Sequence, residues 1–280
     1  MPNQAPHASQ WQKPFLKWAG GKFKIIDIIL RELPPGARLI EPFVGSGAVF
    51  LNAQFPAYTL SDANPDLISL FTHLREEGED FIAAANTLFV PENNHPERYY
   101  ALREEFNTTT DSRRRAALFI YLNRHGFNGL CRYSVKGGFN VPFGRYRKTN
   151  LQVAEMRAFV AKTRSAATVE ILRQDFRQAM AAAVPGDVVY CDPPYVPLNA
   201  TAQFTDYTSD GFGPQDQQDL ADLARTLQRR GIPVLISNHD TPWTRELYEP
   251  ARILAFDVQR LISADAQNRA KAAELLAVFA

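Results

Sequence analysis

The sequence has little cysteine and no long apolar run. Cys131 and Cys191 are its only cysteines, too few for a disulfide framework or a cysteine metal cluster, which fits a reducing cytoplasm. No stretch approaches the roughly 20 apolar residues of a membrane span. The first thirteen residues lack a signal-peptide core and are expected to form a flexible tail. A 280-residue chain that is 45% hydrophobic and 22% charged is instead typical of a globular protein.

Acidic residues are absent between Asp111 and Glu155, although the net charge of the whole chain is only +1. Nine basic residues occur in that interval: Arg113, Arg114, Arg115, Arg124, Arg132, Lys136, Arg145, Arg147 and Lys148. From residue 124 onward the bases alternate with aromatic residues in a glycine-rich context, which offers phosphate contacts, guanidinium groups for base edges and rings that stack. The segment predicts binding to a polyanion such as a nucleic acid. The alternative is a solvated basic face over a small aromatic core.

Strand and helix patterns alternate in both the first and the last part of the chain. Apolar runs predict strands at 37–43, 57–62, 168–172, 188–191, 232–237 and 252–258, and helical periodicity predicts helices at 23–33, 47–53, 152–164, 174–182 and 215–230. Between them only helical patterns are found, at 66–74, 80–89, 98–106 and 113–122. We therefore expect an α/β protein with a doubly wound sheet, in which a discontinuous domain of residues 1–64 and 151–280 is interrupted by an α-rich insertion at 65–150.

The stretch VVYCDPPYVP places an acid at the end of an apolar run. Residues 188–191 are typical of a buried strand, and Pro193 and Pro194 end it because neither can donate a hydrogen bond to a sheet. Asp192 is then expected at the carboxyl end of a strand, which is where ligands bind in open α/β sheets. From these residues alone, a proline turn with a solvated Asp192 is equally compatible.

One further stretch, and an acid at the end of the next predicted strand, concern a small ligand. In EPFVGSGAVF, Gly45 and Gly47 lie at a predicted strand-to-helix turn, where missing side chains let a ligand approach the backbone. Phe50 stands where the dinucleotide pattern has its third glycine, which argues against NAD. Asp62 ends the next predicted strand and can bind both hydroxyls of a ribose, so an adenosine-like ligand without pyrophosphate fits better than a dinucleotide. A purely structural turn is the alternative.

Seven stretches together resemble one family: PFLKWAGGK, EPFVGSGAVF, SDANPDL, YLNRHGFNGLCRY, FNVPFGRY, VVYCDPPY and PVLISNHDT. They are similar to the DNA adenine methyltransferase (Dam) family, and the resemblance runs from about Lys13 to about Leu261. It implies a Rossmann-like methyltransferase fold with an inserted target-recognition domain. It also implies a site-specific enzyme without a metal, which transfers a methyl group from S-adenosylmethionine to N6 of adenine in double-stranded GATC and releases S-adenosylhomocysteine.

The resemblance also assigns residues to the chemistry. It implies a catalytic role for Asp192, Pro193, Pro194 and Tyr195, and cofactor binding by Trp18, Ala19, Lys22, Glu41, Phe43, Gly45, Gly47, Asp62 and Asp192. Asp192 and the carbonyl of Pro193 would accept hydrogen bonds from the adenine amino group, and Tyr195 would stack on the flipped base. Cys191 precedes the acid and is expected to be a buried strand residue without a nucleophilic role.

For DNA, the resemblance points to the second half of the basic segment. Arg132 matches an arginine that binds guanine, and Phe127 matches a tyrosine that wedges between bases. Asn128, Leu130, Pro142 and Tyr146 fall on positions that meet the target bases, while Arg124 and Arg145 are expected to contact phosphates. Ordinary loop packing is the alternative for each.

One departure from the family lies near the end of the chain. A basic, glycine-containing segment is expected after residue 263, whereas this chain has ADAQNRAKAAELLAVFA, which predicts weaker nonspecific affinity for DNA. A last strand is expected near 275–279, and residues 196–212 are expected to form a lid.

Several readings stay open at this point. N6-adenine methylation of another DNA site or of RNA, and a catalytically silent DNA-binding regulator, are the alternatives to GATC methylation. The sequence leaves open whether the enzyme belongs to a restriction-modification pair or works alone in replication and mismatch repair. We expect a monomer in the cytoplasm that associates with the nucleoid through DNA.

Overall fold

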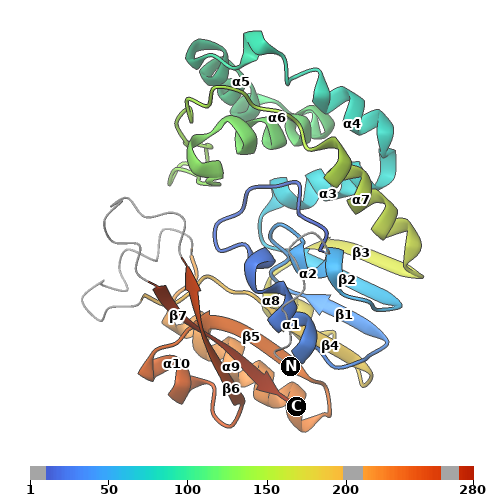
Figure 1. The fold of residues 1–280 in the computed structure, drawn as a ribbon, viewed down its shortest axis with the longest axis vertical. Coiled ribbons are helices and arrows are strands. Elements are labelled where there is room, and N and C mark those ends of the chain that lie inside the picture. Colours follow the sequence, from blue (N-terminus) through green and yellow to red (C-terminus); the bar gives the residue numbers. More distant parts are fainter. Residues whose placement is uncertain (1–10, 198–210, 260–270) are drawn as a thin grey trace, which may run out of the picture. The chain divides into compact units, whose positions relative to one another are not determined.

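A computed structural model describes residues 11–197, 211–259 and 271–280, which form two compact units (Figure 1). Unit 1 comprises residues 1–26, 45–54 and 64–171. Unit 2 comprises residues 27–44, 55–63 and 172–280. The predicted tail of thirteen residues is wrong for its last part, because the backbone N–H of Gln12 donates to Asn52 Oδ1 at 2.8 Å; residues 1–10 lie outside the described part of the chain.

The strands form one seven-stranded sheet in the order β3-β2-β1-β4-β5-β7-β6. The bounds are β1 Arg38–Glu41, β2 Ala57–Asp62, β3 Thr168–Arg173, β4 Asp187–Cys191, β5 Val234–His239, β6 Arg252–Gln259 and β7 Lys271–Phe279. β2, β1, β4 and β5 pair in parallel, whereas β7 runs antiparallel between β5 and β6. The chain therefore has the expected mixed α/β fold, and its last strand begins earlier than predicted.

Helices cover the sheet of unit 2. They are α8 Phe176–Ala181, α9 Pro214–Arg229 and α10 Pro242–Leu247, preceded along the chain by α1 Ile26–Glu32. The core between strands and helices is apolar, as in the buried cluster of Ile40, Val189, Leu220, Ile236 and Leu275. The central strands β4 and β5 are buried along their whole length, as continuous apolar runs in a parallel sheet predict.

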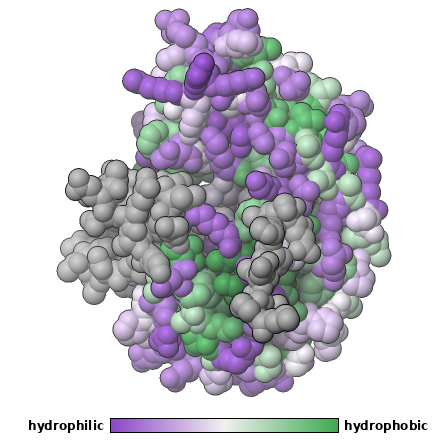
Figure 2. All heavy atoms as spheres, viewed as in Figure 1, coloured by the Kyte–Doolittle hydropathy of each residue, from purple (hydrophilic) through white to green (hydrophobic). Residues whose placement is uncertain are grey.

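Unit 1 is largely helical. Its α-helices are α2 Ala48–Asn52, α3 Pro65–Glu77, α4 Glu79–Asn86, α5 Pro96–Thr108, α6 Ser112–His125 and α7 Val153–Ser165, with 3-10 turns η1 Lys22–Ile25, η2 Pro91–Asn93 and η3 Phe127–Gly129. Side-chain oxygens of Asn64 and Asp111 cap the first backbone amides of α3 and α6. The rings of Phe15, Phe71 and Phe159 pack together at its centre. The visible surface in the region of α5 and α6 is mostly hydrophilic (Figure 2), and apolar residues of these helices such as Leu102, Phe106 and Leu118 are buried.

Candidate active site and nucleic-acid interface

Three acidic side chains stand at the carboxyl ends of neighbouring parallel strands in unit 2. Glu41 is the last residue of β1, Asp62 is the last residue of β2, and Asp192 follows β4 directly. β1 lies between β2 and β4, and the register Ile40↔Val189 and Glu41↔Leu60 brings the three strand ends to one edge of the sheet. Glu41 Oε1 and Asp192 Oδ1 are both shielded from solvent. This edge is where an open α/β sheet binds its ligand.

The turn after Asp192 is held by buried amide side chains. Gln217 Nε2, on α9, donates to the carbonyl of Pro194 at 2.7 Å, and the backbone N–H of Val196 donates to Asn238 Oδ1 at 3.0 Å. Asn238 Nδ2 in turn donates to Gln217 Oε1 at 3.2 Å and to Tyr248 Oη at 2.8 Å. We call these hydrogen bonds the unit 2 clamp. It fixes the backbone at Pro194 and Val196, in a turn whose prolines have no N–H to donate to a neighbouring strand.

Tyr195 is oriented by two neighbouring strands. Its hydroxyl donates to Glu274 Oε2 on β7 at 3.3 Å, and its ring meets the edge of His239 on β5 with 4.8 Å between centroids. Burial, followed by the charges of Asp192 and Glu274, raises the pKa of Tyr195 well above its usual value, so the hydroxyl stays protonated. Sequence reasoning missed Glu274; its only signal is a single acid among the mostly apolar residues of β7.

An aromatic wall adjoins the end of β1. The ring of Phe43 stacks on Phe176 with 5.4 Å between centroids and meets the edge of Phe212 at 5.7 Å. Sequence reasoning missed Phe176 and Phe212. Phe176 has a weak signal, because it follows Asp175, an acid two residues after the end of β3. Such rings can pack against a purine or a cation.

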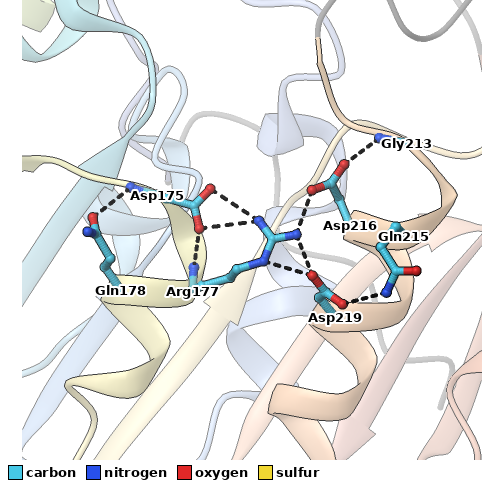
Figure 3. Close-up of polar contacts among 7 residues, drawn as sticks. All are labelled: Asp175, Arg177, Gln178, Gly213, Gln215, Asp216 and Asp219. Atoms are coloured by element: carbon cyan, nitrogen blue, oxygen red, sulfur yellow. Dashed lines mark hydrogen bonds and ion pairs between the residues drawn. The ribbon is translucent and has the colours of Figure 1, made fainter.

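Arg177 links the beginnings of α8 and α9 beside this wall (Figure 3). Its guanidinium donates to Asp216 Oδ1 at 2.6 Å and to Asp219 Oδ2 at 2.8 Å, and it also contacts Asp175, the N-cap of α8. Asp216 accepts a second hydrogen bond from the backbone N–H of Gly213 at 2.6 Å. The first turn of α9, which carries Gln217, is therefore anchored independently of the clamp.

In unit 1, the glycine turn and the Trp18 segment lie against each other. A Cβ on Gly45 would lie 2.9 Å from Trp18 Nε1, and Gly45 has a φ of +47°. A side chain at Gly45 is therefore excluded by both contact and conformation. Gly47 is the N-cap of α2, Lys22 is buried and donates to the carbonyl of Gly20, and Ala19 is exposed. The structure thus brings Trp18 and Gly45 together, as two of the predicted cofactor residues.

The predicted DNA-binding residues lie on the irregular segment that follows α6. Phe127 exposes 48% of its surface, and Asn128, Arg132, Pro142 and Arg145 are also exposed. The segment is folded back on itself, because the N–H of Phe127 donates to the carbonyl of Pro142 at 2.8 Å and Arg132 Nε donates to Asn140 Oδ1 at 2.7 Å. Exposed, conformationally fixed polar and aromatic groups suit the reading of bases.

Three further predicted positions are more enclosed. Leu130 is half-buried, and the ring of Tyr146 lies under Lys17 Nζ, 3.9 Å from the ring centroid. Arg124 Nε is shielded from solvent and has no hydrogen-bond partner among the described residues. Burial lowers the pKa of Arg124, and burial followed by the charge of Arg124 lowers the pKa of Lys17 to about 8. A phosphate near Arg124 would offset this desolvation.

The acid-free interval is less positive than its sequence indicates. Arg113 pairs with Glu77, Arg114 with Glu105 at 2.6 Å, and Arg115 with Asp66 at 2.5 Å. These three arginines join α6 to α3 and α5, so the positive charge that remains for a polyanion lies between residues 124 and 148. The prediction that all nine basic residues form one polyanion-binding segment is therefore narrowed to the basic residues from 124 to 148.

Comparison with known proteins decides the family. The model of the D12 class N6 adenine-specific DNA methyltransferases matches residues 18–262. The chain belongs to this family. The DNA adenine methylase of Serratia marcescens is 51% identical over 268 residues, which cover 95% of this chain and 98% of that protein. That of Escherichia coli (strain K12) is 50% identical over 267 residues and 95% of each chain, and that of Vibrio cholerae serotype O1 (strain ATCC 39315 / El Tor Inaba N16961) is 48% identical over 269 residues and 96% of each chain.

A solved structure of precorrin 8w decarboxylase from Methanobacterium thermoautotrophicum aligns with 96% of this chain and 95% of its own, at a TM-score of 0.38 and 12% identity, which is too weak to bear on function. In this D12 methyltransferase, burial, followed by the charge of Asp192, raises the pKa of the Cys191 thiol. Within the described residues, no group of three or more His, Cys, Asp or Glu side chains could hold a metal ion, and no helix could cross a membrane.

Proposed function

We propose that this chain transfers a methyl group from S-adenosylmethionine to N6 of an adenine flipped out of double-stranded DNA, with GATC as its site. Membership of the D12 family supports the reaction. The observation that carries the assignment to residues is the position of Asp192 at the carboxyl end of β4, in a proline turn held by Gln217 and Asn238. Such rigid placement is what a hydrogen-bond acceptor for the transition state requires.

The residues present fit S-adenosylmethionine. Asp62 ends β2 with a carboxylate that can accept from ribose hydroxyls, and the aromatic wall beside Phe43 offers apolar rings to a purine. We assign donor binding to Trp18, Ala19, Lys22, Glu41, Phe43, Gly45, Gly47, Asp62 and Asp192. When bound, the sulfonium group supplies an activated methyl for direct transfer to a nucleophile.

The chain's own groups act on the adenine. Asp192 and the carbonyl of Pro193 accept hydrogen bonds from the amino group, which turns its lone pair out of conjugation with the ring and stabilises positive charge developing on N6. The ring of Tyr195, oriented through Glu274, stacks on the flipped base. Because the thiol of Cys191 is buried and protonated, we assign no covalent enzyme intermediate.

We assign target recognition to residues 65–150 and catalysis to residues 1–64 and 151–280. Arg132 reads guanine, Phe127 wedges into the stack, Asn128, Leu130, Pro142 and Tyr146 meet the bases, and Arg124 and Arg145 contact phosphates. Within this set, the exposure of Phe127 and Arg132 on a fixed loop supports direct contact with bases. We further propose a monomer that acts on DNA in the cytoplasm.

Methyl transfer from labelled S-adenosylmethionine tests this proposal on three short duplexes that contain GATC, a scrambled site, or GATC methylated at N6 on both strands. We expect label on the first duplex alone, and a fall of at least about a hundredfold for Asp192→Asn, which keeps the size of the side chain but removes its charge. Asp222→Asn, on the exposed face of α9, is the matched control. Label on the scrambled duplex would reject GATC; no label on any duplex with DNA binding intact would indicate a regulator.

A further inference from the structure

Asn123, near the end of α6, joins two segments that are far apart in the sequence. The side chain is buried, with 1% of its surface exposed. Its Oδ1 accepts from the backbone N–H of Lys17 at 3.0 Å, and its Nδ2 donates to the carbonyl of Lys17 at 2.7 Å and to the carbonyl of Gly129 at 3.3 Å. One amide group therefore holds both segments; we call this arrangement the Asn123 clasp.

Each partner of the clasp borders a residue to which the proposed function gives a task. The carbonyl of Lys17 belongs to the peptide that precedes Trp18, whose indole lies against Gly45 in the glycine turn. The carbonyl of Gly129 belongs to the peptide that precedes Leu130, within the base-reading stretch 127–132. A shift of either peptide must therefore break or bend a hydrogen bond to the same side chain.

Close packing reinforces the clasp. A Cβ on Gly129, which has a φ of +64°, would lie against Lys17 Cβ and 2.6 Å from Lys17 Cδ, closer than carbon atoms approach. The side chain of Lys17 then runs on to donate from Nζ to the carbonyl of Arg124 at 3.2 Å and lies over the ring of Tyr146. The two segments consequently have no room to slide past each other while the clasp is intact.

We propose that Asn123 is a positioning residue that couples the binding of the methyl donor by the Trp18 segment to the ordering of the base-reading stretch 127–132. The proposal rests on the proposed function, because it takes donor binding and base reading from there. Coupling of this kind is reciprocal: whatever factor the DNA site adds to donor affinity, the donor must add to DNA affinity. Asn123 itself need touch neither ligand.

Calorimetric titration of S-adenosylhomocysteine into the free protein, and into the protein saturated with a GATC duplex, gives the coupling as the ratio of the two Kd values. We expect a ratio of about fivefold or more in the wild type, and a ratio close to one in Asn123→Ala. The reverse titration of duplex, with and without S-adenosylhomocysteine, must give the same ratios. A purely structural role would weaken both affinities in Asn123→Ala but leave the ratio at its wild-type value, and that result would overturn the proposal.

The chain offers a matched control in Asn52, on α2. Its side chain makes the same kind of backbone pair, accepting from the N–H of Gln12 at 2.8 Å and donating to the carbonyl of Gln12 at 3.0 Å, but Gln12 borders no base-reading residue. Asn52→Ala should therefore lower thermal stability about as much as Asn123→Ala while keeping the wild-type ratio. Loss of the ratio in both variants would assign the effect to stability and reject the clasp.

A second variant covers the case in which Asn123→Ala does not fold. Gly129→Ala keeps the amide but forces Gly129 away from Lys17, so it should also bring the ratio toward one. Failure of the proposed function gives a different result: wild-type protein that binds neither S-adenosylhomocysteine nor the duplex rejects both proposals. If the wild type binds both ligands and Gly129→Ala keeps the wild-type ratio of Kd values, only the clasp is rejected.

Discussion

The Asn123 clasp of unit 1 and the unit 2 clamp both hold an irregular segment through buried amide side chains. The backbones that they hold differ. In unit 2, the segment from Asp192 to Val196 contains two prolines, which restrict its backbone before any side chain acts. The amides of Gln217 and Asn238 then fix it at the carbonyl of Pro194 and the N–H of Val196. In unit 1, the clasped segments contain Gly20, Gly21 and Gly129, whose backbone is not restricted by a ring. There the amide of Asn123 bonds both segments, and the side chain of Lys17 packs against Gly129.

The difference predicts where loss of an amide is felt. A proline turn without its clamp keeps much of its internal shape but is no longer held in place. Loss of the clamp should therefore appear mainly as unpaired buried groups and as a shift of the whole turn, with Asp192 on it. A glycine segment without its clasp gains conformational freedom, so its loss should appear as weakened communication between ligands. The three predictions below test this contrast, from the largest expected effect to the smallest.

Asn238→Ala should have the largest effect. It leaves the N–H of Val196 and the oxygen atoms of Gln217 and Tyr248 without their amide partner in a buried place, which should lower the free energy of unfolding by about 3 kcal/mol. Displacement of the turn, which carries Asp192, should also lower kcat by about tenfold or more. Urea denaturation and steady-state kinetics measure the two effects.

Gln228→Ala is the control for this variant, because Gln228 is an exposed amide that bonds the carbonyl of Ala280. It should change neither quantity by more than a small amount. If Asn238→Ala lost stability but kept the wild-type kcat, the clamp would contribute only to stability. The proline turn alone would then position Asp192. The contrast between the two units would then be stronger than we propose.

His125→Gln tests the acid sensitivity of the region around the clasp. Burial, helped by Lys17 and Arg124, lowers the pKa of His125 from 6.5 to about 4, although its Nδ1 bonds the carbonyl of Tyr121. The unfolded chain binds this proton more tightly, so the stability contributed by the neutral imidazole is complete above pH 6.5 and is lost as the pH falls toward 4. By pH 5 the loss should be about 2 kcal/mol.

Unfolding free energies measured at pH 7 and pH 5 check this prediction. The difference between the two pH values should be smaller in His125→Gln than in the wild type by that amount. His95→Gln, which replaces an exposed imidazole at the N-cap of α5, serves as the reference variant. An equal difference in His125→Gln and the wild type would show that acid acts elsewhere in the chain.

These contrasts also explain what sequence reasoning could reach. The strands were predictable because buried parallel strands are continuous apolar runs, and Asp62 and Asp192 were predictable because an acid directly after such a run lies at the ligand-binding edge. α10, at Pro242–Leu247, was missed because six mixed residues show no helical period. The pairing of Arg113, Arg114 and Arg115 was missed because their acids lie on other helices.

The amides were out of reach for a related reason. Asn123, Gln217 and Asn238 each hold a segment through its backbone atoms. Every residue type offers the same C=O group, and all except proline the same N–H group, so no pattern in the sequence marks these partners. Gly129 has a signal of its own, because its positive φ favours glycine at this position. Its close contact with the side chain of Lys17, however, follows only from the fold. Local sequence therefore predicts which strand end carries an acid, and tertiary structure decides what holds it.

Arg177→Gln should have the smallest effect and separates the clamp from the helix that carries it. Arg177 is 37% exposed, so loss of its bonds to Asp216 and Asp219 should lower the free energy of unfolding by only about 1 kcal/mol or less, and less at high salt. Asp216 still accepts from Gly213, so the first turn of α9 and Gln217 stay in place, and kcat should fall less than about twofold. Arg229→Gln, at the other end of α9, is the control for charge. If Arg177→Gln instead lowered kcat as far as Asn238→Ala does, the catalytic turn would depend on the anchoring of α9, and the clamp would have to be extended to include Arg177.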